Sequence, residues 1–316
     1  MKIGLVLSAT PTYSETFFNA KIKGLQSNGY EVHLFVQQVN SDFDLCGVKK
    51  SYPVFRHNFV KQGYWFFRAL LKIVINLQST VKFISLERKE GKKFLRIAKG
   101  LYGSAHIFGN SLDWLHFGFA TMTIGKENLA KAIGAKMGVS LRGYDLAIYP
   151  LKYPGCYSDM WSKVDKLHTI SDDLLALAKE NGFIGQCKVQ KITPAIDATK
   201  FKVDRSDKDF SGSLKMLTIA RLHWKKGLFD TLQALKILRD KGIEFSYTIV
   251  GEGEQFEALT YLISKLDLTN CVQLAGRKTT TEIRQLMAEN EIYIQYSLSE
   301  GFCNAVQEAQ AAGLLC

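Results

Sequence analysis

Short apolar runs alternate with amphipathic stretches along most of this sequence. The first run covers residues 2–9 and is followed by a polar turn, a predicted helix over residues 14–28 and a second apolar run at residues 31–36. Short β-branched or apolar runs bounded by turn residues are typical of buried strands, and strands that alternate with helices indicate a parallel sheet. The sequence therefore begins with a predicted strand–helix–strand unit.

A second series of the same kind begins near residue 214. It predicts strands at residues 214–220, 245–251, 272–276 and 292–297, and helices at residues 227–241, 256–266 and 282–289. Two such series predict an α/β protein with two Rossmann-like, doubly wound domains.

The stretch between the two series has the composition of a connection. Residues 197–213 contain Asp204, Asp207 and Asp209 and a Ser-Gly-Ser run, and they show no apolar periodicity. We therefore predict a first domain over residues 1–196, a linker over residues 197–213 and a second domain over residues 214–316.

Composition narrows the class of protein. At 316 residues and 47% hydrophobic content, the chain can bury more than one core. Its first residues lead straight into Pro11 without the apolar core and cleavage site of a signal peptide, so we expect a cytoplasmic protein. No apolar run approaches the roughly 18 residues needed to span a bilayer. The six cysteines are scattered without a CxxC pair, which argues against a zinc site and a disulfide framework.

The net charge of +11 is concentrated in one segment. From Lys49 to Lys99 there are 13 Lys or Arg residues against Glu87 and Glu90, an excess equal to that of the whole chain. Residues 61–100 mix these cations with aromatic and aliphatic side chains. This pattern is typical of a surface that rests on anionic lipid, and a core helix with a solvated basic face is the alternative. Nucleic-acid binding is less favoured because no recognised nucleic-acid motif accompanies the charge.

Two cations follow the first predicted strand of the second domain. Arg221 and Lys226 come directly after that strand, and Gly227 opens the next helix. Open α/β sheets bind ligands at the carboxyl ends of their strands, where such cations could converge on a diphosphate. Solvated Lys and Arg are also common in strand-to-helix loops, so both interpretations stay open at this point.

Two further loops follow later strands of the same domain. Gly251, Glu252 and Gly253 come after the second strand and would allow close approach of a ligand, although the same residues also make an ordinary tight turn. Glu300 and Glu308 lie eight positions apart, in a loop that becomes a helix. The amides at that helix start favour an anion. The two carboxylates could be an acid/base pair or part of a solvated helix face.

Taken in order, these elements resemble the family 4 retaining glycosyltransferases of GT-B fold. The resemblance rests on residues 219–227 (IARLHWKKG), 249–254 (IVGEGE), 274–283 (LAGRKTTTEI) and 297–313 (SLSEGFCNAVQEAQAAG), the last of which matches the E-x7-E element of the family. The first half is similar more loosely, through residues 11–17, 115–119, 140–145, 167–174 and 191–201. The resemblance implies two Rossmann-like domains facing a cleft, the first on the acceptor side and the second binding the donor.

The resemblance also assigns roles in the second domain. Arg221 and Lys226 would neutralise the donor diphosphate, Glu300 would hold hydroxyls of the transferred sugar and Glu308 would bind the nucleotide ribose. These cations and Glu300 are the expected catalytic residues, acting without a metal or another cofactor because fixed cations and amides stabilise the leaving group. The remaining expected donor contacts are Gly251, Glu252, Gly253, Gly301, Phe302 and Cys303.

The acceptor side departs from the family pattern. Where relatives often have a histidine before Gly-x-Asp, this chain has Arg142 ahead of Gly143 and Asp145, which removes a titratable group. The first loop lacks the paired glycines of many relatives. The acceptor-side candidates are Arg142, Asp145, His116, Ser14 and Glu15. We expect His116 to be a structural side chain at a strand end, with a catalytic base as the alternative.

The function implied by the resemblance is transfer of a hexose from a UDP- or GDP-sugar to a glycan or lipid-linked acceptor. Transfer would proceed with retention at the anomeric carbon, in surface polysaccharide synthesis. The missing signal peptide and the basic segment, taken separately from the resemblance, predict a cytoplasmic enzyme that is peripheral to the inner face of the cell membrane. The alternatives are a sugar-nucleotide epimerase or phosphorylase of GT-B fold, and a catalytically dead nucleotide-sugar-binding protein.

The sequence stops at residues 313–316, just after the predicted helix that carries Glu308. In the family it resembles, further βα units and a final helix follow at this point. We therefore expect the second domain to be incomplete, with an exposed edge beside its fourth strand and with feeble turnover.

Overall fold

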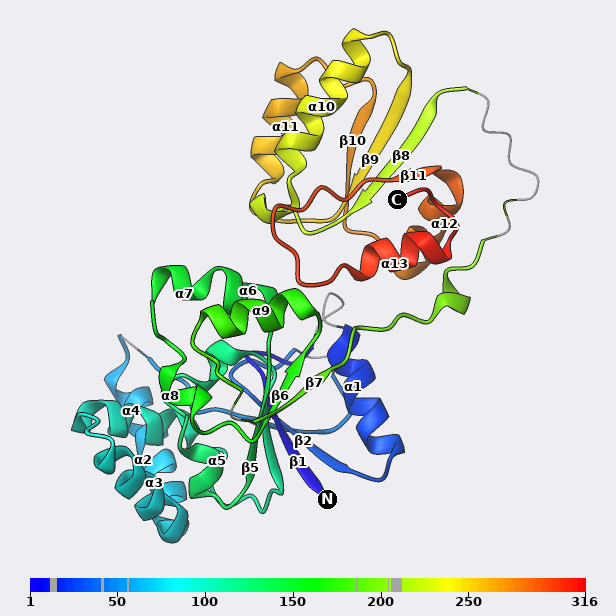
Figure 1. The fold of residues 1–316 in the computed structure, drawn as a ribbon. Helices are drawn as coiled ribbons and strands as arrows, with labels where there is room; N and C mark the ends of the chain where they lie inside the picture. The colour runs from blue at the N-terminus through cyan, green and yellow to red at the C-terminus, as the bar shows by residue number, and fades with distance from the viewer. Residues whose placement is uncertain (12–15, 41–42, 56, 186, 204, 206–211) are drawn as a thin grey trace. The chain divides into compact units, whose positions relative to one another are not determined.

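The computed structural model describes the chain apart from residues 12–15, 41–42, 56, 186, 204 and 206–211. It divides into two compact units, Met1–Thr193 and Pro194–Cys316. Each unit has its own sheet, and each is described by itself (Figure 1). Much of the predicted linker and the candidate residues Ser14 and Glu15 lie outside the described residues.

The first unit is built on a seven-stranded sheet with the order β3-β2-β1-β4-β5-β6-β7. All neighbouring strands are parallel. The order reverses between β1 and β4, as in a doubly wound sheet. The strands are β1 (Lys2–Val6), β2 (Glu31–Val36), β3 (Gly47–Lys50), β4 (Trp114–Phe117), β5 (Lys136–Ser140), β6 (Lys166–Thr169) and β7 (Lys188–Lys191).

The central strands of this sheet are buried because helices cover it. In β1 every position after Lys2 is buried. Phe18 and Ile22 of α1 (Thr16–Ser27) pack against Leu5 and Leu34 in one hydrophobic cluster. The later helical segments are η2 (Ala120–Thr123), α5 (Leu129–Ala132), α6 (Gly143–Ala147), α7 (Tyr149–Lys152), α8 (Ser158–Trp161) and α9 (Asp172–Glu180).

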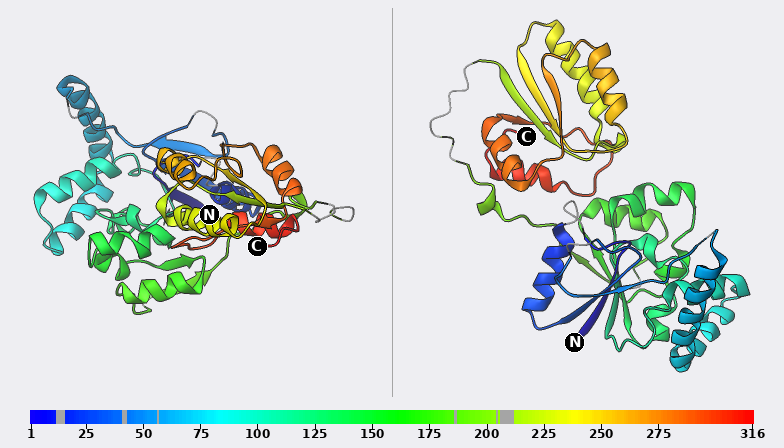
Figure 2. Two further views of the ribbon diagram at one scale, coloured as in Figure 1. Left: turned by 90° about the horizontal axis from the view of Figure 1, so that it is seen from above. Right: turned by 180° about the vertical axis from the view of Figure 1, so that it is seen from behind.

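Three helices between β3 and β4 form a group at one side of this unit: α2 (Phe59–Ile75), α3 (Leu77–Lys89) and α4 (Phe94–Ser104) (Figure 2). Within the basic and apolar segment 61–100, the first helix ends at Asn76. The Asn76 side chain donates to the Lys72 carbonyl at 2.8 Å, and Thr80 Oγ1 donates to the Ile73 carbonyl at 2.9 Å, so the carbonyls at the end of α2 are satisfied by side chains. No single described helix is long and apolar enough to cross a membrane. Taken together, α2 and α3 are long and apolar enough by length and composition, but the pair is bent by 96°.

The second unit has a four-stranded sheet with the order β10-β9-β8-β11, again all parallel. The strands are β8 (Leu214–Ile219), β9 (Phe245–Val250), β10 (Val272–Gly276) and β11 (Ile292–Tyr293). The helical segments are η3 (Ala198–Lys200), η4 (Trp224–Lys226), α10 (Leu228–Asp240), α11 (Phe256–Lys265), α12 (Thr280–Glu289) and α13 (Asn304–Ala311).

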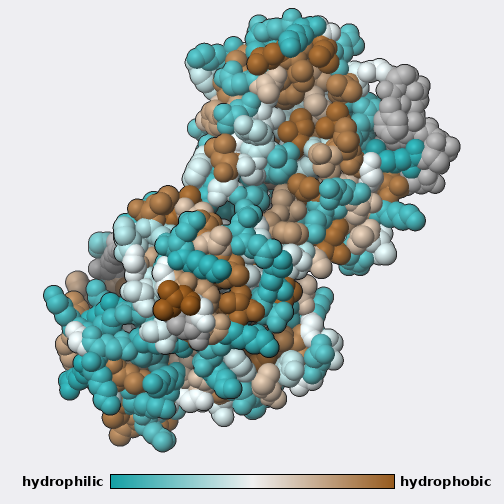
Figure 3. Space-filling view, in the orientation of Figure 1, coloured by the Kyte–Doolittle hydropathy of each residue, from teal (hydrophilic) through white to brown (hydrophobic). Residues whose placement is uncertain are grey.

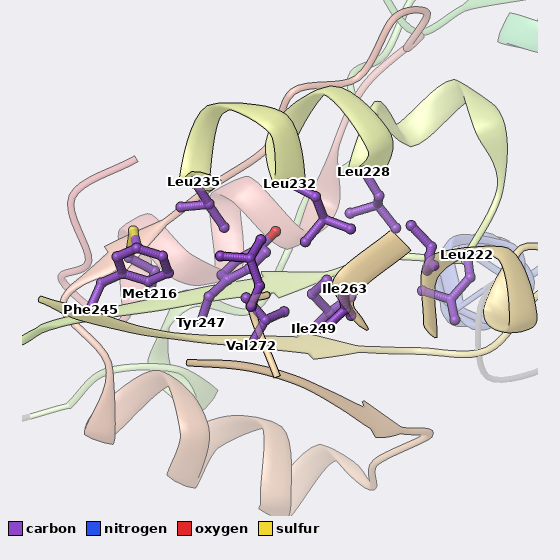
Figure 4. Close-up of a cluster of buried hydrophobic side chains, with 12 residues drawn as sticks. Met216, Leu222, Leu228, Leu232, Leu235, Phe245, Tyr247, Ile249, Ile263 and Val272 are labelled. Carbon is purple, nitrogen blue, oxygen red and sulfur yellow. The ribbon is translucent and has the colours of Figure 1, made fainter. Parts of the chain in front are cut away.

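Both faces of this sheet are covered. Leu228, Leu232 and Leu235 of α10 point onto Tyr247 and Ile249 of β9 in one cluster (Figure 4). A second cluster joins α12 and α13 to the sheet; its fully buried or nearly buried members include Leu217, Val250, Met287, Tyr293 and Ala309. The hydrophobic spacing along each helix therefore places it on the sheet as the sequence pattern predicts.

The structure corrects the prediction for the last strand. β11 ends at Tyr293, four residues before the predicted end at residue 297. The Ile294 amide still donates to the Leu217 carbonyl of β8 at 2.9 Å, but the Ile294 carbonyl accepts from Thr218 Oγ1 at 2.5 Å, and the Leu298 amide donates to the Lys225 carbonyl at 2.8 Å. The regular backbone pairing with β8 therefore ends here. Beside β11, where an exposed edge was expected, Leu315 forms a parallel bridge with Ile292.

Candidate functional site

The second sheet reverses its strand order at β8. The chain runs from β8 to β9 and β10 on one side and then places β11 on the other side of β8. A crevice at such a switch point is where open α/β sheets bind ligands. Arg221 and Lys226 follow the carboxyl end of β8, and Glu300 follows that of β11, so the fold brings these three predicted residues to the switch point.

Lys226 and Glu300 form an ion pair, although 74 positions separate them in the sequence. The two side chains are 21% and 32% exposed. Ser297 Oγ lies 3.5 Å from the same Glu300 oxygen. The pair places a cation and a carboxylate together at the carboxyl edge of the sheet, where each fixes the orientation of the other.

Gly227 allows the loop after β8, which carries Lys226, to contact the loop after β11, which carries Glu300. Its φ of +62° lies in the left-handed region, and a Cβ at this position would lie 1.9 Å from the Tyr296 carbonyl oxygen. The Leu298 amide donates to the Lys225 carbonyl at 2.8 Å. The loop after β11 is therefore packed directly on the backbone beside Lys226, which only glycine permits.

Arg221 lies on the exposed side of the same loop. The backbone around it is held by the loop after β9: the Leu222 amide donates to the Glu252 carbonyl at 2.9 Å. A Cβ on Gly251 would lie 1.9 Å from the Ala220 carbonyl oxygen, and one on Gly253 would lie 2.2 Å from the Leu222 carbonyl oxygen. These glycines thus admit a neighbouring loop of the protein itself, and they position the backbone that carries Arg221.

The loop after Glu300 leads into α13, with Gly301, Phe302 and Cys303 half-buried. Cys303 is the N-cap of α13 and provides no side-chain hydrogen bond to the first turn. Its thiol instead contacts Gln295 Oε1 at 3.5 Å, and burial raises the pKa of Cys303. The first amides of an α-helix that lack a side-chain cap are donors for an anion.

Glu308 lies on α13 and is half-buried. Burial raises the pKa of its carboxyl to about 7. No Lys or Arg among the described residues forms an ion pair with it. A partly desolvated carboxyl without a cation gains from hydroxyl donors, and two adjacent hydroxyls of a ribose supply them.

The sequence did not reveal the hydrogen-bonded chain beneath these residues. The Tyr293 hydroxyl donates to the Ile219 carbonyl at 3.0 Å and lies 3.1 Å from Gln295 Oε1, and Gln295 Nε2 donates to Ser297 Oγ at 2.6 Å. The link continues through Ser297 to Glu300. The alternation of polar side chains within residues 292–297 could have predicted this chain, because every second residue of an extended segment lies on the same face.

The first unit contains a separate chain of polar side chains. Lys21 Nζ lies 2.8 Å from His116 Nε2, which lies 2.8 Å from Ser140 Oγ, and Ser140 Oγ lies 2.9 Å from His168 Nδ1. Burial, and secondarily the charge of Arg142, lowers the pKa of Lys21 to about 7, and burial lowers that of His168 to about 4. Burial also holds the pKa of His116 well below its usual value, which makes this ring a poor proton acceptor at neutral pH.

The other acceptor-side candidates lie near the start of α6. The Arg142 guanidinium stacks 4.1 Å from the centre of the Phe17 ring. Asp145 is fully buried, and its carboxylate accepts from the Ala120 amide at 3.0 Å and from Thr121 Oγ1 at 2.9 Å. Asp145 therefore fixes η2 to α6. Among the described residues, no group of three or more His, Cys, Asp or Glu side chains could hold a metal ion.

Known glycosyltransferases are similar to this chain, and the match to a family model lies in the second unit. Residues 200–316 match the family described as glycosyl transferases group 1. WcaL of Escherichia coli K12, named as a glycosyltransferase of colanic acid biosynthesis, is 25% identical over 99% of this chain and 81% of its own length. The amylovoran biosynthesis glycosyltransferase AmsK of Erwinia amylovora is 29% identical over 66% of this chain, which spans about half of AmsK (52%).

Solved structures share the fold of the whole chain. HepE of Anabaena, crystallised with UDP-glucose, superimposes with a TM-score of 0.67 at 14% identity, over 99% of this chain and 79% of HepE. Sucrose-phosphate synthase of Thermosynechococcus elongatus gives a TM-score of 0.67 at 12% identity, over 99% and 80%. The predicted GT-B fold is confirmed, and the similarities together support a glycosyltransferase.

Proposed function

We propose that this chain is a retaining glycosyltransferase of family 4 that moves a hexose from a nucleotide diphosphate sugar to a glycan or lipid-linked acceptor in surface polysaccharide synthesis. One observation carries the proposal: Lys226, on the loop that also carries Arg221, forms an ion pair with Glu300 at the switch point of a sheet whose residues match glycosyl transferases group 1. The names of WcaL and AmsK, both of polysaccharide biosynthesis, support the kind of product.

The cations serve the leaving group. When the bond from the sugar to the diphosphate breaks, negative charge grows on the diphosphate oxygens. The Lys226 ammonium is held in place by Glu300, and the packing around Gly251 fixes the backbone that carries Arg221. Preorganised charge of this kind stabilises a transition state more than it stabilises the bound substrate. The first amides of α13, the helix that follows Glu300 in the chain, add donors for an anion.

The two glutamates serve the two ends of the donor. Glu300, already bonded to Lys226 and next to Ser297, accepts from hydroxyls of the transferred sugar. Glu308 accepts from the ribose hydroxyls of the nucleotide and is ionised when it does so. The binding of UDP-glucose by HepE supports a UDP-sugar as the first donor to test, with a GDP-sugar as the second.

Product analysis separates this function from its rivals. The protein is incubated with radiolabelled UDP- and GDP-sugars, with and without acceptor glycans, in buffer free of phosphate. A transferase releases the nucleoside diphosphate and labels the acceptor. An epimerase instead interconverts sugar nucleotides, and a phosphorylase needs phosphate. A binding protein without activity is stabilised by the nucleotide but leaves every donor intact.

A further inference from the structure

Helix α2 is the least buried long helix of the first unit. Of its 17 residues only Ala69 is buried. Its outer positions are nevertheless large and apolar, with Phe59 86% exposed, Val60 85% and Ile75 77%. Phe66, Phe67, Leu70, Leu71 and Val74 are exposed as well. We call this surface, together with the exposed parts of α3 and α4, the α2–α4 face. Water-exposed apolar area on this scale marks a binding surface.

Cations lie between these apolar side chains, and the acidic residues of the segment do not neutralise them. Glu87 is buried and accepts from Asn128 Nδ2 at 2.8 Å, and Glu90 pairs with Lys163 at 2.7 Å. Both carboxylates are thus bonded to the body of the unit. Hydrophobic and hydrophilic side chains lie side by side at the lower left of the molecule in Figure 3, where Figure 1 places α2, α3 and α4.

A cavity of about 490 Å³ lies between α4 and the turn after η2. Its charged lining consists of Lys93, Arg96, Lys99 and Lys126, and no acidic residue lines it. Arg96 is partly compensated, at 3.4 Å from Glu127 and 3.6 Å from Asp159. The cavity is open to solvent, so a group can enter it from the surface.

The three lysines of the cavity keep their charge uncompensated. No Asp or Glu of the described chain forms an ion pair with Lys93, Lys99 or Lys126. Burial lowers the pKa of Lys126, as expected of a cation that gives up water without gaining a partner. Lys93 and Lys99 are exposed beside it. A partly desolvated cation such as Lys126 favours a bound anion, and a phosphate here accepts from Lys93 and Lys99 as well.

The rim of the cavity is apolar. Leu95 and Ile124 belong to its lining and are 64% and 36% exposed, and the neighbouring Phe94 is 76% exposed. An anion in the cavity therefore has hydrocarbon contacts available beside it. A ligand with a phosphate group and apolar chains matches both features, whereas a free phosphate uses only one.

We propose that the α2–α4 face binds an anionic phospholipid bilayer and that the cavity holds the phosphate of one lipid headgroup. Apolar side chains interleaved with Lys and Arg suit the boundary between headgroups and acyl chains. A protein partner fits less well, because lysine is depleted where protein surfaces meet. The proposal is independent of sugar transfer.

Co-sedimentation with vesicles tests it. The full chain is mixed with vesicles of phosphatidylcholine alone, and with vesicles of equal parts phosphatidylcholine and phosphatidylglycerol. The cavity variant Lys93→Gln, Lys99→Gln, Lys126→Gln is compared with Lys131→Gln, Lys179→Gln, Lys188→Gln, which removes equal charge from exposed positions of the same unit. The cavity variant is expected to bind anionic vesicles about a hundredfold more weakly, at about fivefold for each charge. The control should match the wild type.

Apolar variants complete the design, because the cavity variant could alter folding. Phe59→Ser with Val60→Ser should weaken binding to anionic vesicles without lowering the melting temperature. The matched apolar control, Leu151→Ser with Ile192→Ser, should leave vesicle binding unchanged. Equal binding by the cavity variant and its control would overturn the proposal. Two other results would also overturn it. One is that the protein binds inorganic phosphate in calorimetry but does not bind vesicles. The other is that the protein self-associates without vesicles and that Phe59→Ser with Val60→Ser abolishes this self-association.

Discussion

Lys226 and Arg221 are proposed to stabilise the negative charge that grows on the diphosphate in the transition state. Replacing either with Ala should lower kcat by about 10²–10³, as the loss of one preorganised donor does elsewhere, with a smaller change in donor affinity. Steady-state kinetics measures both quantities. Lys265→Ala is the control, because it removes a cation from an exposed position on α11 of the same unit and should leave kcat unchanged. Equal kcat values for Lys226→Ala and wild type would remove Lys226 from the site.

Glu308 is the residue proposed to hold the ribose. Glu308→Gln should weaken nucleoside diphosphate binding by about 1.5–3 kcal/mol, the usual contribution of hydrogen bonds to a charged group. Calorimetry with UDP and GDP measures this loss. Glu289→Gln, on the exposed end of α12, should bind the nucleotide as the wild type does. Wild-type affinity in Glu308→Gln would contradict the assignment.

The same residue predicts a pH dependence of stability. Burial raises the pKa of Glu308 to about 7 in the folded protein, above its ordinary 4.5. Between these values the unfolded chain loses this proton and the folded chain keeps it, so the contribution to stability falls as pH rises from 4.5 to about 7. The melting temperature of Glu308→Gln minus that of the wild type should therefore grow from pH 5 to pH 8 without nucleotide. A constant difference would show that this carboxyl is solvated.

At the scale of elements, the site depends on loops packed against each other. Gly227→Ala should destabilise the second unit by more than the roughly 1–2 kcal/mol that a left-handed backbone costs a residue with a Cβ, because the new atom would overlap the Tyr296 carbonyl. Gly242 also has a positive φ, of +75°, but a Cβ there meets nothing within 4 Å. Gly242→Ala should thus show the backbone cost alone. Denaturant unfolding compares the two, and equal losses would mean that the loop after β11 simply moves away.

Element boundaries show where sequence patterns suffice. The strands β2 and β10 were predicted at their observed bounds, because apolar runs between turn residues leave little choice of register. β11 was predicted too long, since the Thr218 hydroxyl and the Lys225 carbonyl, far away in sequence, bond the Ile294 carbonyl and the Leu298 amide in place of regular strand pairing. The Lys226–Glu300 pair and the Tyr293–Gln295–Ser297 chain could not be predicted for the same reason: they join side chains that meet only when β11 is placed beside β8.

For the whole molecule, two doubly wound sheets were predictable from the alternation of strand and helix patterns, and the solved structures share that fold. The location of the net positive charge along the sequence could also be predicted, but the groups that contact these cations could not. The structure shows that Glu87 and Glu90 are bonded inward and that Lys93, Lys99 and Lys126 surround a cavity. Periodicity cannot reveal this, because it does not say which side of a helix group meets the rest of the unit.

The central claim is retaining sugar transfer from a nucleotide donor, and the anomeric configuration of the first product tests it most directly. The protein is mixed with an α-linked UDP-sugar and an acceptor glycan, and the anomeric proton of the product is followed by NMR from the earliest time points. A retaining transferase gives a new α-linked sugar on the acceptor, formed as UDP is released, and this signal is lost in Lys226→Ala. A β-linked product would contradict retention, and an unchanged donor across the UDP- and GDP-sugars would contradict transfer.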